Sequence, residues 1–282
     1  NLANPRRHPE VSRRLADPRG LSEAEAPALV GEGKAVRLVA CGIHASEIGA
    51  SQMAMEWAHA LATAEDAETK RRLSEVVLLL VPSLNPDGHR MEVDWYRKNL
   101  GTRWEGSRMP WLYHHYVGHD NNRDFAQLTQ AETKTISRVL YHDWFPQVFL
   151  DEHQMGTSGP RMFVPPYADP LDPDIDPLVI REVNMIGSLM SMRLEQAGKS
   201  GVISAWAFDV SWPGGSKNTA WWKNVTGVLT EVASVRLATP IEVPPTELRG
   251  GGKGLVEDGP QVNFPTPWRG GPWRLRDRRG VV

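Results

Sequence analysis

The sequence predicts an α/β fold, a mostly parallel or mixed, twisted sheet with helices on both faces, in a single domain. Short apolar runs alternate along the chain with longer segments whose apolar residues recur at helical spacing. The run at residues 76–82 (VVLLLVP) is apolar at almost every position, as expected for a strand that is covered on both faces. Because parallel strands need a crossover connection, strands separated by helices favour a parallel sheet.

Four strands are expected, at residues 36–40, 76–82, 147–150 and 225–232. The expected helices are residues 48–61, which residues 67–73 would extend, then 127–141 and 178–197. The NPDG sequence at residues 85–88 predicts a turn after the second strand, because Asn, Pro and Gly supply the backbone conformations that turns need. Two segments are expected to be loops, 101–120, rich in Trp, Tyr and His, and 161–177, rich in Pro and Asp.

Composition excludes several classes of protein. A net charge of −2, with 23 % charged residues among 282, leaves no basic footprint for nucleic acid. No stretch approaches the roughly 20 apolar residues of a membrane span. Cys41 is the single cysteine, which excludes an intrachain disulfide; we expect a small buried residue there rather than a nucleophile. The chain begins at Asn1 without a signal-peptide pattern, so we expect a processed protein or a fragment.

Ionisable residues follow the predicted strands. His44 and Glu47 come after the first, and His153 comes directly after the third. Because ligands bind outside the carboxyl ends of strands in open α/β sheets, we expect these side chains at one edge. For His44 and Glu47 alone, a helix N-terminus capped by Ser46 competes with a pair of metal ligands, and the two can coexist. Two imidazoles and one carboxylate are typical of a catalytic zinc site that keeps a position open for water.

Six motifs, in this order, resemble those of the zinc metallocarboxypeptidase family of the carboxypeptidase A type. They are HxxE (44–47), NPDG (85–88), WYRKN (95–99), GHDNNRDF (118–125), DEHQ (151–154) and GGS…LTE (214–231). The match covers roughly residues 36–232, and its specificity lies in the order and spacing of the motifs rather than in any one of them.

The resemblance implies roles for eight residues. The residues at the family's functional positions are the zinc ligands His44, Glu47 and His153, the general base Glu231, the carbonyl-polarising Arg97, and the pair Asn122 and Arg123 that grips the substrate's terminal carboxylate. A planar guanidinium suits a carboxylate, although a surface ion pair is the alternative for either arginine. Glu152 is the alternative base. Lys217 falls at the base of the pocket for the terminal side chain, where it would attract Glu or Asp, or else it points to solvent.

The chain departs from the family's pattern in three places. Asp124 stands where the family has Asn, and an extra carboxylate beside Arg123 would weaken or orient its hold on an anion. The mobile tyrosine expected shortly before the GGS stretch is missing, so its role is vacant or filled by Trp212 or another loop. The residues before HxxE are few for the family's opening hairpin and helix, which favours a chain truncated at one or both ends.

We therefore expect a zinc metallocarboxypeptidase, a hydrolase that uses one zinc ion per chain and metal-activated water on the C-terminal bond of peptides or proteins. One alternative is a zinc amidohydrolase acting on acylated amino acids or cell-wall peptides, and another is a catalytically inactive peptide-binding relative. No nucleic-acid partner is expected, and the resemblance favours a secreted or periplasmic location. Residues 1–235 are expected to form the catalytic domain, and the Pro/Gly-rich residues 236–282 to complete it or to begin a following region.

Overall fold

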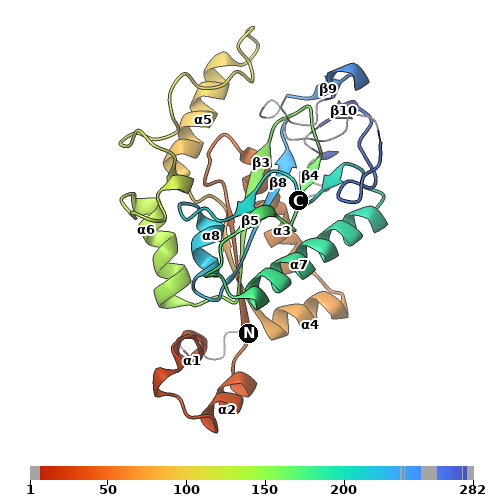
Figure 1. The fold of residues 1–282 in the computed structure, drawn as a ribbon. Helices are drawn as coiled ribbons and strands as arrows, with labels where there is room; N and C mark the ends of the chain where they lie inside the picture. The colour runs from red at the N-terminus through yellow and green to blue at the C-terminus, as the bar shows by residue number, and fades with distance from the viewer. Residues whose placement is uncertain (1–6, 236, 238, 249–258, 275, 278–282) are drawn as a thin grey trace.

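The computed structural model describes residues 7–235, 237, 239–248, 259–274, 276 and 277. A six-stranded mixed sheet with the order β2-β1-β3-β8-β4-β6 lies at its centre (Figure 1). Its strands are β1 (Ala35–Cys41), β2 (Val76–Val81), β3 (Val148–Met155), β4 (Met162–Phe163), β6 (Val202–Ile203) and β8 (Thr226–Ala233). The four long strands pair in parallel, whereas β4 runs antiparallel to β8. The expected α/β fold is confirmed.

Helices and short strand pairs surround this sheet. The α-helices are α1 (Arg7–Ala16), α2 (Glu25–Glu32), α3 (Ile48–Thr63), α4 (Ala67–Glu75), α5 (Pro86–Asn99), α6 (Ala131–Arg138), α7 (Pro177–Gln196) and α8 (Ser216–Trp221). Short 3₁₀ helices form η1 (Pro18–Gly20), η2 (Asn121–Arg123) and η4 (Pro245–Glu247), and η3 (Val139–Asp143) is a π-helix. β5 (Ala168–Leu171) pairs with β7 (Asp209–Val210), and β9 (Ile241–Val243) with β10 (Gly271–Trp273). None of the helices in the described ranges has the length and apolar character to cross a membrane.

Alternation along the strands decides which helices each side chain meets. Val39 and Leu150 pack with residues of α3 and α7 on one face of the sheet. Leu38 and Phe149, one position earlier in each strand, pack with α6 and α8 on the other face. Because the side-chain period of a strand is two, Asp151, His153 and Glu231 share the α6 and α8 face, whereas Glu152 and Thr230 share the α3 and α7 face. This alternation places the polar residues described below.

Several local expectations were wrong. Residues 85–88 do not form an isolated turn: the Asn85 side chain accepts the Gly88 N–H at 2.9 Å and caps α5, with Pro86 at the first helical position, where its missing N–H costs nothing. The cap of α3 is Glu47 rather than Ser46, and it makes no side-chain capping bond. Residues 67–73 belong to a separate helix, the helix expected from 127 begins at Ala131, and the expected loop at 161–177 contains β4 and β5.

The described residues beyond 235 pack against the same sheet. The Trp273 indole N–H donates to the Ala233 carbonyl at 3.0 Å, and its ring joins an apolar cluster with strand β8. Arg161, only 1 % exposed, lies 3.9 Å from the ring centroid of Trp268 and 4.9 Å from that of Trp273. These contacts agree with the alternative that the segment completes the same domain. Residue 236 at the expected boundary and residues 249–258 lie outside the described residues.

Candidate active site

Three ligand-type side chains meet at the carboxyl ends of β1 and β3. His44 and Glu47 lie between β1 and α3, and His153 lies on β3, which pairs with β1 up to Cys41. The ligand atoms of these three residues lie within 4.8 Å of one another. Glu47 Oε1 is 2.9 Å from His44 Nδ1, and Glu47 Oε2 is 3.0 Å from His153 Nδ1. One carboxylate therefore faces the same nitrogen of both imidazoles.

A further carboxylate holds the other nitrogen of each ring. His44 Nε2 lies 2.9 Å from Asp120 Oδ1, and His153 Nε2 lies 2.8 Å from Asp151 Oδ2. Partners of this kind fix the tautomer and orientation of a ligating histidine. The two Nδ1 atoms and the Glu47 carboxylate are thus left for a metal. Two imidazole nitrogens and one carboxylate oxygen fit zinc, and more specifically an open catalytic site.

The charges at this cluster are strongly coupled. Burial opposes protonation of His44, but Glu47 and Asp120 outweigh it and raise the pKa of His44 to about 9. Burial favours the neutral form of Glu47, yet the two imidazoles lower its pKa to about 2. Burial also opposes protonation of His153, and Asp151 and Glu47 raise its pKa well above the usual value. The site therefore favours positive charge beside Glu47, which protons and a divalent cation would compete to supply.

Glu231 lies beside the cluster on β8, directly opposite His153 in the β3–β8 register. Its side chain is 8 % exposed, and burial, followed by the charge of Glu47, raises its pKa to about 8. A carboxyl group that titrates near neutrality suits general acid–base chemistry. Glu152 accepts the Thr230 hydroxyl at 2.5 Å on the opposite face of the sheet, so the geometry does not favour it as the base.

A cavity of about 320 Å³ opens on the α8 side of the cluster. It is lined by His44, Asn122, Arg123, His153, Trp212, Lys217 and Glu231, among others. The Asn122 side chain is buried: its Oδ1 accepts the Ser216 N–H at 2.9 Å, and its Nδ2 lies 3.1 Å from His153 Nε2. The Arg123 guanidinium is half-exposed and lies 4.9 Å from the Trp212 ring centroid. Arg123 Nη1 donates to the Asn122 carbonyl at 2.9 Å and lies 3.9 Å from Asp120 Oδ2. Because the rest of the guanidinium is exposed, Arg123 is the cation of this cavity that an incoming anion can reach.

Lys217 does not point to solvent; that alternative was wrong. The residue is 4 % exposed, and its ammonium donates to the Asp209 carbonyl at 3.3 Å and to Asn218 Oδ1 at 3.2 Å. It lies 4.5 Å from the ring centroids of both Tyr167 and Trp221. Burial lowers its pKa to about 7, and no ion pair with a carboxylate holds it within the described residues. A buried ammonium thus lines the same cavity as Arg123.

The geometry does not support the roles that the sequence suggested for Arg97 and Asp124. Arg97 is exposed near the end of α5 and does not line the cavity of about 320 Å³. Asp124 is fully buried and accepts the Thr129 N–H and the Gln130 N–H, each at 2.9 Å, as well as the Thr133 hydroxyl. Asp124 therefore anchors the start of α6, and the expectation that it would weaken or orient Arg123 was wrong.

A second cavity, of about 740 Å³, opens on the other side of Glu47. It is walled by the loop before residue 114 and by the ends of β3 and β8. Tyr113 lines it, with its ring centroid 5.8 Å from that of His44, and burial raises the pKa of its phenol. Tyr113 and Trp212 thus flank the cluster on opposite sides, and both stand in loops where periodicity gave no signal.

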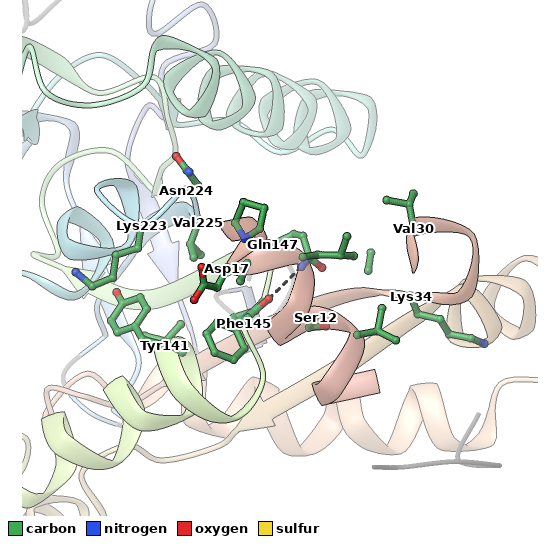
Figure 2. Close-up of a pocket in the computed structure, with 18 residues that line it drawn as sticks. Ser12, Asp17, Val30, Lys34, Tyr141, Phe145, Gln147, Lys223, Asn224 and Val225 are labelled. Carbon is green, nitrogen blue, oxygen red and sulfur yellow. Dashed lines mark hydrogen bonds between the residues drawn. The ribbon is translucent and has the colours of Figure 1, made fainter. Parts of the chain in front are cut away.

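A cavity larger than either of these, about 800 Å³, lies far from this chemistry, near the amino ends of the strands. Figure 2 shows Ser12, Tyr141, Phe145 and Val225 around it, and in Figure 1 α1 and α2 lie at the end of the molecule opposite α5. Asp17 is the single carboxylate among its lining residues. Cavity size therefore does not identify the active site. The candidate metal ligands and Glu231 line the two cavities beside Glu47 instead.

Comparisons with known proteins agree with the geometry. Residues 20–149 match the model of the zinc carboxypeptidase family, which confirms the resemblance found in the sequence. The structure is similar to a metallo-carboxypeptidase from Pseudomonas aeruginosa in complex with (2-guanidinoethylmercapto)succinic acid, with 16 % identity and a TM-score of 0.53. It is also similar to a metallo-carboxypeptidase from Burkholderia cenocepacia, with 11 % identity and a TM-score of 0.54. Each match covers 88 % of this chain and 54 % of the other, so this chain spans about half the length of these proteins. No curated protein matched.

Proposed function

We propose that this chain hydrolyses the C-terminal peptide bond of peptides or proteins, because residues 20–149 match the model of the zinc carboxypeptidase family. The observation that carries the proposal is one cavity lined by two metal-ligand candidates, a buried carboxyl group and a half-exposed arginine, namely His44, His153, Glu231 and Arg123. One zinc ion held by His44, Glu47 and His153 would polarise the scissile carbonyl and lower the pKa of a bound water.

Glu231 is the proposed general base. Its place opposite His153 directs its carboxyl group into the cavity that the ligands line. It would accept a proton from the attacking water and return that proton to the nitrogen of the leaving amino acid, which cannot depart as an amide anion. Asp120 and Asp151 act indirectly in this scheme, by fixing the orientation of the two imidazoles.

Arg123 is proposed to bind the terminal carboxylate. Asn122 is proposed to hold the neighbouring wall of the cavity in place through its contacts with Ser216 and His153. Asn122 is committed to Ser216 and His153, so Arg123 supplies the charge. Arg97 retains a proposed role through the resemblance alone, and the loss of turnover in an Arg97→Ala variant would support it.

Amidation of the substrate tests this anion site. A neutral C-terminal amide offers Arg123 no charge, and hydrogen bonds to charged groups contribute about 1.5–3 kcal/mol, which corresponds to a loss of roughly 10–10²-fold in kcat/KM. An Arg123→Ala variant should cleave free and amidated peptides at similar rates, whereas Arg90→Ala, on an exposed face of α5, should keep the discrimination. Equal cleavage of both peptides by the wild type would contradict a carboxypeptidase. Cleavage of N-acetyl amino acids without cleavage of longer peptides would support the amidohydrolase alternative.

Lys217 is proposed to select Glu or Asp as the terminal residue. A buried ammonium without a carboxylate partner would gain a charge-assisted hydrogen bond from an acidic side chain in the cavity of about 320 Å³. We expect the wild type to prefer a terminal Glu over the isosteric Gln by about 10-fold or more, and Lys217→Met to lose that preference. The exposed Lys98→Met serves as the matched control. Equal kcat/KM for substrates ending in Glu, Gln and Phe would show that Lys217 is not the selector.

A further inference from the structure

Glu92 is a buried carboxyl group without a partner in the described part of the chain. It lies on α5 and is 5 % exposed, whereas Asp87 and Asp94 of the same helix are exposed. No hydrogen bond or ion pair with another described residue reaches its carboxyl group. Burial alone raises its pKa to about 7. Neither carboxyl oxygen is fully enclosed, so the group opens toward a cavity while lacking a counter-ion among the described residues.

The side chain of Glu92 lines the cavity of about 740 Å³ that opens beyond Glu47. The charged residues of this lining are Glu47, Glu92 and Arg108, and Arg108 is exposed. Trp111 and Tyr113 line the same cavity and add aromatic rings, whose faces attract cations. With Glu47 committed to the two imidazoles, Glu92 is the acidic group left to meet a ligand in this cavity.

The position of this cavity relates it to the reaction, and this step rests on the function proposed above. If the terminal residue occupies the cavity with Arg123 and Lys217, the rest of the substrate must leave the cluster on its other side. Glu47 lines the second cavity, whereas His44 and His153 line the first, so the ligand cluster separates the two. The residues that precede the scissile bond therefore extend toward Glu92.

We propose that this second cavity binds an ammonium group on the acyl side of the substrate, with Glu92 as its counter-ion. A carboxylate and an ammonium that pair away from bulk water attract each other strongly, and the pairing removes the cost of leaving Glu92 alone. The ammonium comes from a lysine-like side chain or from the free amino terminus of a short peptide. The two sources share one chemistry and are separated by the choice of substrate.

Three peptides with a common C-terminal glutamate test the proposal. They are acetyl-Gly-Lys-Glu, its neutral analogue acetyl-Gly-norleucine-Glu, and Gly-norleucine-Glu with a free amino terminus. We expect the wild type to favour one of the two ammonium peptides over the neutral one by about 10-fold or more in kcat/KM, and Glu92→Gln to bring that ratio close to one. Asp94→Asn, which removes an exposed charge from the same helix, should leave the ratio unchanged. Equal values for all three peptides in the wild type, or a preference retained in Glu92→Gln, would overturn the proposal.

Binding and stability measurements make the outcome independent of turnover. Dissociation constants of the same peptides, measured by calorimetry on the zinc-loaded Glu231→Gln chain with and without Glu92→Gln, should show the same ratio. If no peptide is cleaved but the ratio in binding depends on Glu92, the ammonium site stands and the carboxypeptidase proposal falls. We expect Glu92→Gln and Glu92→Met to unfold at or above the wild-type Tm, because each removes an unpaired buried carboxyl group. A Tm several degrees lower in both variants would assign Glu92 to the fold and overturn the site.

Discussion

Replacing Glu231 by glutamine should lower kcat by at least the roughly 10²–10⁴-fold typical of a lost general base, while zinc stays bound at one ion per chain. Glutamine keeps the size of the side chain and its hydrogen-bonding capacity, but it cannot accept the proton of water. Glu231 stands outside the three-residue ligand cluster, so the substitution leaves all three donors in place. Turnover should be measured together with metal content on the same preparation.

The pH profile gives this prediction a second readout. Burial, followed by the charge of Glu47, raises the pKa of Glu231 to about 8. A bound divalent cation favours the carboxylate, so the acidic limb of kcat should lie below pH 8 in the zinc-loaded enzyme, with activity rising as Glu231 loses its proton. The limb should vanish from the residual activity of Glu231→Gln. The control is Glu242→Gln on β9, where the side chain is exposed. Near-normal turnover in metal-loaded Glu231→Gln would place the base elsewhere.

Much of the site could be predicted because strand ends are visible in a sequence. His44, His153 and Glu231 follow or end apolar runs, and parallel pairing brings the carboxyl ends of those runs to one edge. Because successive side chains of a strand point to opposite faces of the sheet, His153 and Glu231 lie on one face and Glu152 on the other. Lys217 was placed at a pocket by motif spacing, and its burial agrees with that placement, although its role as a selector stays a proposal.

The rest depends on tertiary contacts that local sequence does not encode. Asp120 lies in a loop without periodicity, so its contact with His44, 76 residues earlier, gave no local signal. Asn85 and Pro86 suit a turn and a helix start equally well, which explains the helix missed at α5. That error also hid Glu92, which shares the buried face of this helix with Gly88 and Asn99 at helical spacing. Had the helix been predicted, Glu92 would have stood out as an acidic residue on its buried face.

Replacing His153 or His44, two of the three candidate metal ligands, by alanine should abolish stoichiometric zinc binding and activity together. A site with three protein donors that loses one keeps too few for tight binding. The predicted loss is specific to the Nδ1 atoms that face Glu47, so His142→Ala, an exposed imidazole on η3, should retain both zinc and activity.

A graded series separates loss of the metal from loss of the fold. His153→Ala also leaves Asp151 buried without the imidazole that contacts it, so its Tm should fall as well as its zinc content. Asp120→Asn keeps all three donors and removes the carboxylate charge that orients His44 and that also lies 3.9 Å from Arg123 Nη1. A loss of about 10–100-fold in zinc affinity is expected. If zinc affinity tracked Tm across the series, the metal would be responding to general unfolding. If His153→Ala bound zinc fully, the third ligand would have to be another residue, and Asp120, which already contacts His44, would be the first to replace.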